Sequence, residues 1–196
     1  MQPAQTIGGG RARGICGSGV IDAVSELLRC GIIDRTGRMA STIDDPLLNE
    51  RLSEENGVRQ FLLERDSSSP IVFTQKDVRE VQLAKAAVYA GFRLLLKETG
   101  LGCKDIDKVY IAGGFGNYMD MESALNIGLI PDELRGKTLS VGNAAGAGAK
   151  LFLLSKAYRQ KTAGIINLVS YIELSDRSDF QVFFGSSDGE DAPDIF

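Results

Sequence analysis

Hydrophobic residues recur at helical spacing in two segments of the chain. The first covers residues 20–28 and directly follows a glycine-rich lead-in. The second predicts a long amphipathic helix over residues 75–98. Thr74 and Asp77 resemble a capping box at its start, and Gly100 ends it. Its apolar side is expected to carry Val78, Val81, Leu83, Ala84, Ala87, Val88, Gly91, Leu94 and Leu95.

Shorter apolar runs in the rest of the chain predict strands, and further periodic segments predict helices. Clusters of Ser, Gly and Pro separate these segments and are typical of turns. The strands are expected at 58–64, 71–73, 109–112, 137–142 and 180–184, and the later helices at 121–126, 143–158 and 164–174. Because strands and helices alternate, the pattern predicts an α/β or α+β fold.

The composition excludes several classes of chemistry. The 196 residues include no histidine, so Ser-His-Asp and Cys-His nucleophile systems and HExxH metal helices are excluded. The net charge of -4 argues against general binding of nucleic acid. Cys16, Cys30 and Cys103 form no CxxC pair, which fits a reducing compartment. No apolar run predicts a membrane span or a signal peptide, so a cytoplasmic protein is expected.

Many of the 23 glycines lie in three clusters where a strand or loop meets a helix. The clusters are residues 14–19, 112–116 and 142–148. A helix N-terminus exposes unpaired N–H groups, and glycine lets an anionic ligand approach the backbone closely. None of the clusters is a P-loop or a GxGxxG fingerprint. They predict loops that hold phosphates, with tight turns and close helix packing as the alternative.

The second cluster, with the strand before it, reads Val-Tyr-Ile-Ala-Gly-Gly-Phe-Gly at 109–116. It resembles the adenosine motif of the superfamily that includes actin, sugar kinases, acetate kinase and the heat-shock chaperone ATPases. Five segments in order more closely resemble the C-terminal part of the ATP-dependent reductive activators of corrinoid proteins. These segments are Gly14–Val24, Thr74–Ala87, Ile111–Tyr118, Ile127–Pro131 and Val141–Ala145. The resemblance implies an α/β fold, one lobe of an actin-like (ribonuclease H-like) ATPase with a mixed sheet flanked by helices.

The resemblance also implies a function. Such activators use ATP, with Mg²⁺, to reduce an inactive Co(II) corrinoid to Co(I) in a methyltransferase or O-demethylase system. In that family ATP lies between two related lobes, and the electron enters through an N-terminal iron–sulfur domain. Residues 1–184 match only the second lobe, and residues 185–196 are expected to form a disordered acidic tail. Catalysis by this chain alone is therefore not expected.

The same resemblance predicts partners and cofactors. The corrinoid protein and the N-terminal lobe of the same protein are the expected partners, and a homodimer is a further expectation. ATP or ADP with Mg²⁺ would bind in the full-length protein. A 2Fe–2S cluster is expected only in the N-terminal domain that this sequence lacks. Nucleic acid and membranes are not expected partners.

Carried over position by position, the resemblance implies three groups of nucleotide-binding residues. The group expected against the adenine and ribose is Gly113, Gly114, Phe115, Gly116 and Asn117. The group expected at the start of the first helix, beside the ribose or phosphates, is Gly17, Ser18 as the N-cap, Gly19 and Asp22. The group expected in the segment that connects the lobes is Gly142 and Asn143. No catalytic residue and no metal ligand set can be named.

Several alternatives stay open. Asp22 could reach the nucleotide through Mg²⁺ or the ribose hydroxyls, or could simply favour a first helical turn. Cys16 could ligate a cluster, although packing of a small residue is preferred because no second cysteine is suitably placed. Lys76 and Arg79 could contact adenine or a partner, or be solvated charges. Two other functions are a noncatalytic module that docks the corrinoid protein or dimerises, and a disfavoured small-molecule kinase half-domain.

Overall fold

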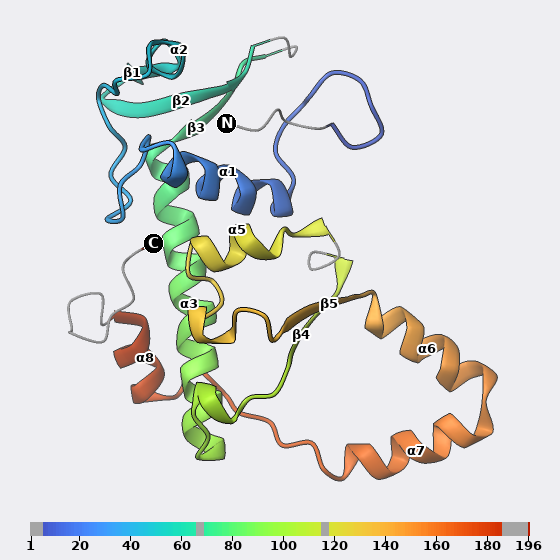
Figure 1. Ribbon diagram of the computed structural model, residues 1–196. Coiled ribbons are helices and arrows are strands. Elements are labelled where there is room, and N and C mark those ends of the chain that lie inside the picture. Colours follow the sequence, from blue (N-terminus) through green and yellow to red (C-terminus); the bar gives the residue numbers. More distant parts are fainter. Residues whose placement is uncertain (1–5, 66–68, 115–117, 186–195) are drawn as a thin grey trace.

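The computed structural model describes residues 6–65, 69–114, 118–185 and 196. One long helix, α3 (Gln75–Thr99), runs through the molecule, and the other elements lie in two groups beside it (Figure 1). One group lies beside the N-terminal half of α3 and the other beside its C-terminal half. The long helix predicted from the sequence is therefore the element that both groups share.

The ends of α3 are capped as the sequence predicts. At the start, the Thr74 N–H donates to Asp77 Oδ2 at 2.7 Å. The Asp77 N–H in turn donates to Thr74 Oγ1 at 3.2 Å, which completes a capping box. At the other end, Gly100 has a φ of 66°, in the left-handed region that glycine adopts without strain. Local sequence alone is sufficient to set the length of this helix.

The buried side of α3 differs from the predicted one. The buried residues are Val78, Val81, Gln82, Lys85, Ala90 and Leu94. Four residues predicted to lie on the apolar side are instead exposed: Ala84, and Leu83, Val88 and Leu95, which are each 52% exposed. Those four predictions are wrong because the neighbouring elements cover only one stripe of the helix. Gln82 takes a buried place because its amide has a partner: Nε2 donates to the Thr36 carbonyl at 3.0 Å.

A three-stranded antiparallel sheet lies beside the N-terminal half of α3. Its order is β1 (Leu52–Glu55), β2 (Val58–Glu64) and β3 (Ile71–Thr74). Asn56 and Gly57 connect β1 to β2 with φ values of 51° and 74°. Positive φ at both central residues is the geometry of the tight hairpin turn that Asn-Gly favours. The strands predicted at 58–64 and 71–73 are confirmed.

Helix α1 (Gly17–Arg29) and the short helix α2 (Pro46–Asn49) complete the first group. A single hydrophobic core extends from α1 and the sheet, across α3, to the second group. The largest fully buried side chains of the described structure are Phe61, Leu27, Ile32, Ile33, Met39, Leu94, Ile127, Leu134, Val24 and Val78, and all except Leu94 belong to this core. These residues come from both groups, so the two groups share one core.

The second group contains a two-stranded parallel sheet of β4 (Val109–Ala112) and β5 (Thr138–Gly142). Helix α5 (Met121–Asn126) connects the strands and packs against α1. Two short 3₁₀ helices, η1 (Cys103–Asp105) and η2 (Asp132–Leu134), flank the strands. The predicted strands and the predicted helix at 121–126 are present, and the fold is α/β, although its strands lie in two sheets.

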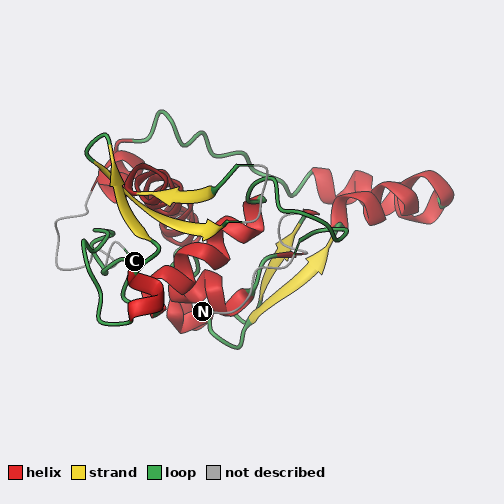
Figure 2. Cartoon of the chain, turned by 90° about the horizontal axis from the view of Figure 1, so that it is seen from above, coloured by secondary structure: helices red, strands yellow, loops and turns green. Residues whose placement is uncertain are grey.

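After β5 the chain forms α6 (Ala144–Leu154) and α7 (Lys156–Ile166), which project away from the rest of the molecule (Figure 2). The prediction of a single helix at 143–158 is wrong. Ser155 interrupts it with an extended conformation, φ −133° and ψ 120°, and its hydroxyl caps α7. The serine side chain thus begins a second helix where hydrophobic periodicity alone predicted a continuous one.

Two further predictions near the C-terminus are wrong. The helix predicted at 164–174 does not form, because α7 ends at Ile166 and the chain to 177 is irregular. The strand predicted at 180–184 lies within helix α8 (Ser178–Gly185). Helix α8 packs along the C-terminal half of α3. Tertiary contact with α3 therefore overrides the strand preference of this aromatic segment.

Ion pairs hold α8 against α3. Asp179 bonds to Arg177 at 2.9 Å and to Lys97 of α3 at 3.0 Å. Arg177 also bonds to Glu98 of α3. The Arg177 guanidinium, and then the Lys97 ammonium, hold the pKa of the Asp179 carboxyl well below its usual range. Of the predicted acidic tail, residues 186–195 lie outside the described residues, while the Phe196 side chain is buried.

Gly37 offers a test of how the loop before β1 is held to α3. Its φ is 78°, and an added Cβ would lie 2.1 Å from Nε2 of the buried Gln82. We expect Gly37→Ala to lower the free energy of unfolding by about 2–3 kcal/mol, since it adds backbone strain and breaks the Gln82 bond to Thr36. Urea unfolding followed by circular dichroism measures this.

Gly57→Ala is the matched control. Gly57 has a similar φ of 74°, but an added Cβ would meet nothing within 4 Å. Its cost should be backbone strain alone, about 1 kcal/mol. Equal losses in the two variants would show that the Gln82 contact contributes nothing.

Candidate functional site

Two of the predicted glycine clusters meet at the carboxyl ends of the two parallel strands. Gly113 follows β4 and Gly142 ends β5, with φ values of 105° and 60°. The Gly113 N–H donates to the Gly142 carbonyl at 2.8 Å. Ligands of open α/β sheets bind outside the carboxyl ends of the strands, where both of these turns lie. The structure therefore brings together two groups of residues that are distant in the sequence.

None of the described residues fills the space beside the first of these turns. A Cβ added at Gly113 or Gly114 would meet nothing within 4 Å. The glycines are therefore not required for tight packing, and a ligand could approach the backbone here. Phe115, Gly116 and Asn117 lie outside the described residues.

Asn143 has a structural role at the start of α6. Its Oδ1 accepts a hydrogen bond from the Gly146 N–H at 2.8 Å, which caps the helix. A Cβ on Gly146 would lie 2.8 Å from Asn143 Nδ2, so this glycine leaves room for the cap. The third cluster thus combines a turn, a cap and a helix start next to the Gly113 loop.

The first cluster forms the N-terminus of α1. The N-cap is Cys16, whose sulfur accepts from the Gly19 N–H at 3.4 Å, so the prediction of Ser18 as the N-cap is wrong. Ser18 is instead buried, with its hydroxyl 3.3 Å from the Cys16 sulfur. The hydrogen bond from Ser18, then that from the Gly19 N–H, lowers the pKa of the Cys16 thiol. Cys16 is exposed, so this helix end presents a thiol with increased thiolate character.

Gly19 is closely packed against the residues before it. A Cβ at this position would lie 3.2 Å from Ile15 Cγ2 and 3.4 Å from the Cys16 sulfur. The loop before α1 therefore folds back onto the first turn of the helix. At this glycine, close packing explains the residue without a ligand.

Asp22 links α1 to the segment that follows the second cluster. Its carboxylate accepts a hydrogen bond from the Ser123 side chain of α5, while Oδ1 is buried with no partner among the described residues. Desolvation, and to a lesser extent the nearby Asp120, raises the pKa of the Asp22 carboxyl. The side chain therefore faces α5 in this structure.

The sequence did not indicate Asp120 and Ser123 as neighbours of Asp22. Asp120 caps α5 by accepting from the Ser123 N–H at 2.7 Å. The signal that could have identified them is the Asp-x-x-Ser capping pattern, in which Asp120 directly precedes the predicted helix at 121–126 and Ser123 lies in its first turn. Through this contact, the start of α1 lies on the same side of the molecule as the loop after β4 (Figure 1).

Comparison with known families matches residues 2–188 to the family described as the C-terminal domain of RACo, the ASKHA domain. The chain belongs to this family. The predicted resemblance to corrinoid activators and the predicted actin-like ATPase fold are thereby confirmed.

The chain is also similar to two longer curated proteins. It is 41% identical over 180 residues to the corrinoid activation enzyme RamQ of Eubacterium limosum, covering 86% of this chain and 30% of that protein. It is 29% identical over 149 residues to the Co(II) methylated amine-specific corrinoid protein reductase of Methanosarcina barkeri, covering 76% of this chain and 24% of that protein.

A solved structure, the reductive activator for corrinoid, iron–sulfur protein, matches with a TM-score of 0.82 and 39% identity. The match covers 93% of this chain and 29% of that structure's chain. The chain therefore spans less than a third of the length of the family members that it resembles.

The described part of the chain contains neither a helix suited to span a membrane nor a cluster of metal-ligating side chains. None of its described helices is both long and apolar enough to cross a membrane. No group of three or more Cys, Asp or Glu side chains within the described ranges is arranged to hold a metal ion.

The raised pKa of Asp22 predicts a pH dependence. A carboxyl whose pKa is higher in the folded than in the unfolded state binds more protons when folded, so stability falls as pH rises through that interval. We expect Asp22→Asn to unfold at a higher temperature than the wild type at neutral pH, because the desolvated charge beside Asp120 is removed. The difference should vanish at acidic pH, where Asp22 is protonated. Thermal melts of both proteins across pH measure this, and a less stable variant at neutral pH would contradict it.

Proposed function

We propose that the chain is the nucleotide-binding C-terminal part of an activator that couples ATP hydrolysis to the reduction of Co(II) corrinoid to Co(I). The observation that carries this proposal is membership of the ASKHA family, together with 41% identity to a corrinoid activation enzyme. The reaction adds one electron to cobalt, and its product serves a methyltransferase or O-demethylase system. A corrinoid protein is then the partner of the full-length activator.

The glycine turns after β4 and β5 fit a nucleotide held by backbone. Adenine and ribose would lie in the open space beside Gly113 and Gly114, with Gly142 and Asn143 on the adjacent strand end. The N-terminus of α1, with Gly17, Ser18 and Gly19, would face the ribose or phosphates. These groups bind and orient the nucleotide through N–H donors and need no histidine or lysine.

Mg²⁺ would bind with the nucleotide, because this ion is usually held by phosphates, waters and one or two carboxylates. Asp22 is the proposed carboxylate of this site, but its unpartnered Oδ1 is buried against α5. The side chain would have to turn toward the loop after β4 to contact the bound ion or the ribose. Binding of the nucleotide would then be coupled, through α1 and α5, to closure of the two lobes around it.

The electron would come from a 2Fe–2S cluster in a part of the protein outside this chain. ATP supplies the free energy that makes reduction of Co(II) favourable. In this chain, the turns after β4 and β5 would bind the nucleotide more tightly in one conformation of the protein than in another. That difference in affinity would shift the protein toward the conformation that binds more tightly.

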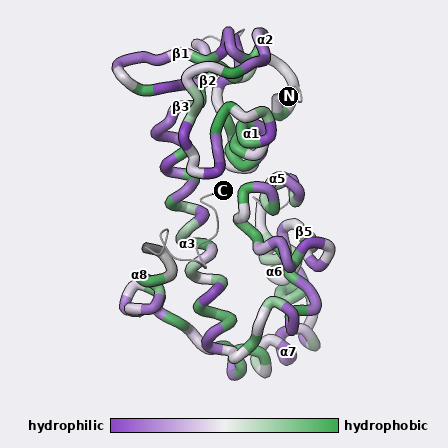
Figure 3. The backbone as a smooth tube through the Cα atoms, turned by 60° about the vertical axis from the view of Figure 1, so that its left-hand side comes forward, coloured by the Kyte–Doolittle hydropathy of each residue, from purple (hydrophilic) through white to green (hydrophobic). Residues whose placement is uncertain are grey.

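A second function, a docking or dimerisation module, is favoured by the large total exposed surface and by the apolar residues that lie on it. The chain exposes 13082 Å², whereas a compact protein of 21.1 kDa exposes about 9,000 Å². Both strands of the parallel sheet and the helices α6 and α7 contribute exposed apolar residues to this surface, and Figure 3 colours the chain by the hydropathy of each residue. The exposed residues there include Tyr110, Leu139, Val141, Leu151, Leu153, Leu154, Tyr158, Ile165 and Ile166. Such a surface suits the first lobe of the same protein or a second copy of the chain.

Nucleotide titration separates the two functions. We expect this chain to bind ATP and ADP, and Gly114→Asp to weaken both by about tenfold or more, because the added charged side chain would occupy the space proposed for adenine and ribose. Isothermal titration calorimetry measures the affinities, and circular dichroism checks that the variant is folded.

Gly164→Asp is the control, since Gly164 lies on α7 and an added Cβ there also meets nothing within 4 Å. It should bind both nucleotides as the wild type does. If the wild-type chain binds neither nucleotide but associates with the corrinoid protein or with itself, the docking function is correct and the nucleotide site is not.

A further inference from the structure

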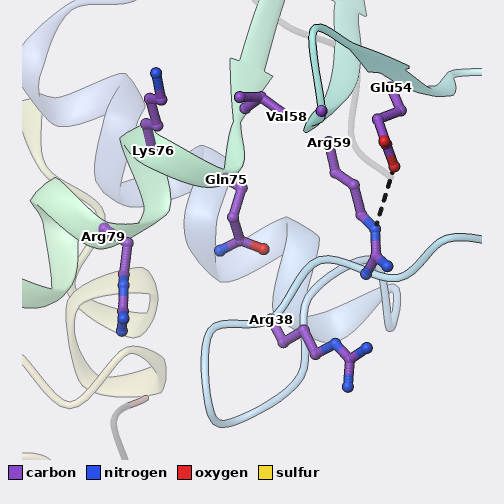
Figure 4. Close-up of a pocket in the computed structure, with 8 residues that line it drawn as sticks. Arg38, Glu54, Val58, Arg59, Gln75, Lys76 and Arg79 are labelled. Carbon is purple, nitrogen blue, oxygen red and sulfur yellow. Dashed lines mark ion pairs between the residues drawn. The ribbon is translucent and has the colours of Figure 1, made fainter.

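A basic pocket lies at the start of α3, between that helix, the β1–β2 hairpin and the loop before β1 (Figure 4). Its volume is about 370 Å³. It is lined by Arg38, Glu54, Gly57, Val58, Arg59, Gln75, Lys76 and Arg79. These residues come from three separate parts of the chain, so only the folded structure brings the four basic side chains together.

Hydrogen bonds fix the walls of the pocket. Gln75 Nε2 donates to the Gly37 carbonyl at 2.7 Å, and Gln75 Oε1 accepts from the Met39 N–H at 2.7 Å. One Arg59 guanidinium nitrogen donates to the Met39 carbonyl at 2.6 Å. The loop that carries Arg38 is thereby held to both the helix and the hairpin. The pocket is therefore formed before any ligand arrives.

The lining carries four cations against one carboxylate. Arg59 Nε lies 3.9 Å from Glu54, so one cation is partly neutralised. The hydrogen bond from the Thr36 hydroxyl, and to a much smaller extent the charge of Arg38, lowers the pKa of the Asp34 carboxyl. Arg38 forms no ion pair with any described residue. Lys76 and Arg79 likewise have no ion-pair partner among the described residues. This excess of positive charge lies on a chain whose net charge is -4, so the pocket is a local feature and not part of a general basic surface.

The close-up shows how these side chains are directed. In the view, Arg59 of the hairpin and Arg38 of the loop lie on one side of Gln75, and Arg79 of the helix extends downward on the other side. Lys76 extends in the opposite direction. The guanidinium groups therefore line the pocket on both sides of Gln75, and each can form two parallel hydrogen bonds to a phosphate.

We propose that this pocket binds a phosphorylated small molecule. Its volume corresponds to about a dozen waters, which is more than one phosphate requires and leaves room for an organic group. The Val58 side chain and the aliphatic stems of the arginines offer apolar contact for that group. The positive lining repels metal cations and selects anions.

The pocket is separate from the candidate nucleotide site. It lies at the N-terminal end of α3 beside the antiparallel sheet, whereas the glycine turns follow the strands of the parallel sheet. The inference therefore does not depend on the proposed function, and either could be correct without the other.

Titration of the chain with pyrophosphate and with glucose 6-phosphate tests this pocket. We expect binding of both probes, and Arg38→Gln and Arg79→Gln should each weaken it by about tenfold or more. Lys76→Gln removes a charge from the same helix turn but from a side chain directed away, so it should weaken binding by less than about threefold. Arg59 is not substituted because it also holds the Met39 carbonyl.

Three results would overturn the proposal. The first is no measurable binding of either probe by the wild-type chain. The second is binding that Arg38→Gln and Arg79→Gln leave unchanged while Gly114→Asp abolishes it, which would place the phosphate at the glycine turns. The third is tighter binding of a hexaglutamate peptide than of either phosphate probe, which would indicate an acidic protein segment as the partner. Circular dichroism of each variant confirms that lost binding is not lost folding.

Discussion

The parallel pairing of β4 with β5 is the constraint on which the candidate site depends. It places the turns at Gly113 and Gly142 side by side, with a backbone hydrogen bond between them. Two-stranded parallel sheets are rarely stable alone, because such strands are normally covered on both faces. Here Tyr110, Leu139 and Val141 remain exposed. The pairing is therefore held from one side by the core around α3, and its other side is available to a further lobe.

Local signals predicted the elements whose ends are set by their own residues. Thr74, Asp77 and Gly100 cap α3 through contacts within a few residues, so pattern alone located this helix. The turn glycines after β4 and β5 were found for the same reason, since a positive φ restricts the residue type. The family resemblance then ordered these local signals into one fold.

Contacts between distant segments were not predictable in this way. Leu83, Val88 and Leu95 fit the helical period but face outward, because the period does not specify how wide a stripe the neighbours cover. Asp22 matched a nucleotide-facing position, yet its neighbour is Ser123, 101 positions later in the numbering of the chain. The pocket of Arg38, Arg59 and Arg79 likewise exists only because Gln75 ties a loop to the start of α3. Side-chain partners across the fold require the structure.

The two candidate binding regions use different chemistry, which allows one experiment to distinguish them. The glycine turns offer backbone N–H groups, whereas the basic pocket offers guanidinium groups. The most direct test of the central claim is to follow backbone amide chemical shifts by NMR while ATP is added to the isotopically labelled chain. The account predicts the largest shifts at Gly113, Gly114 and Gly142. Shifts confined to the residues around Arg38 and Arg79, with none at the glycine turns, would contradict it.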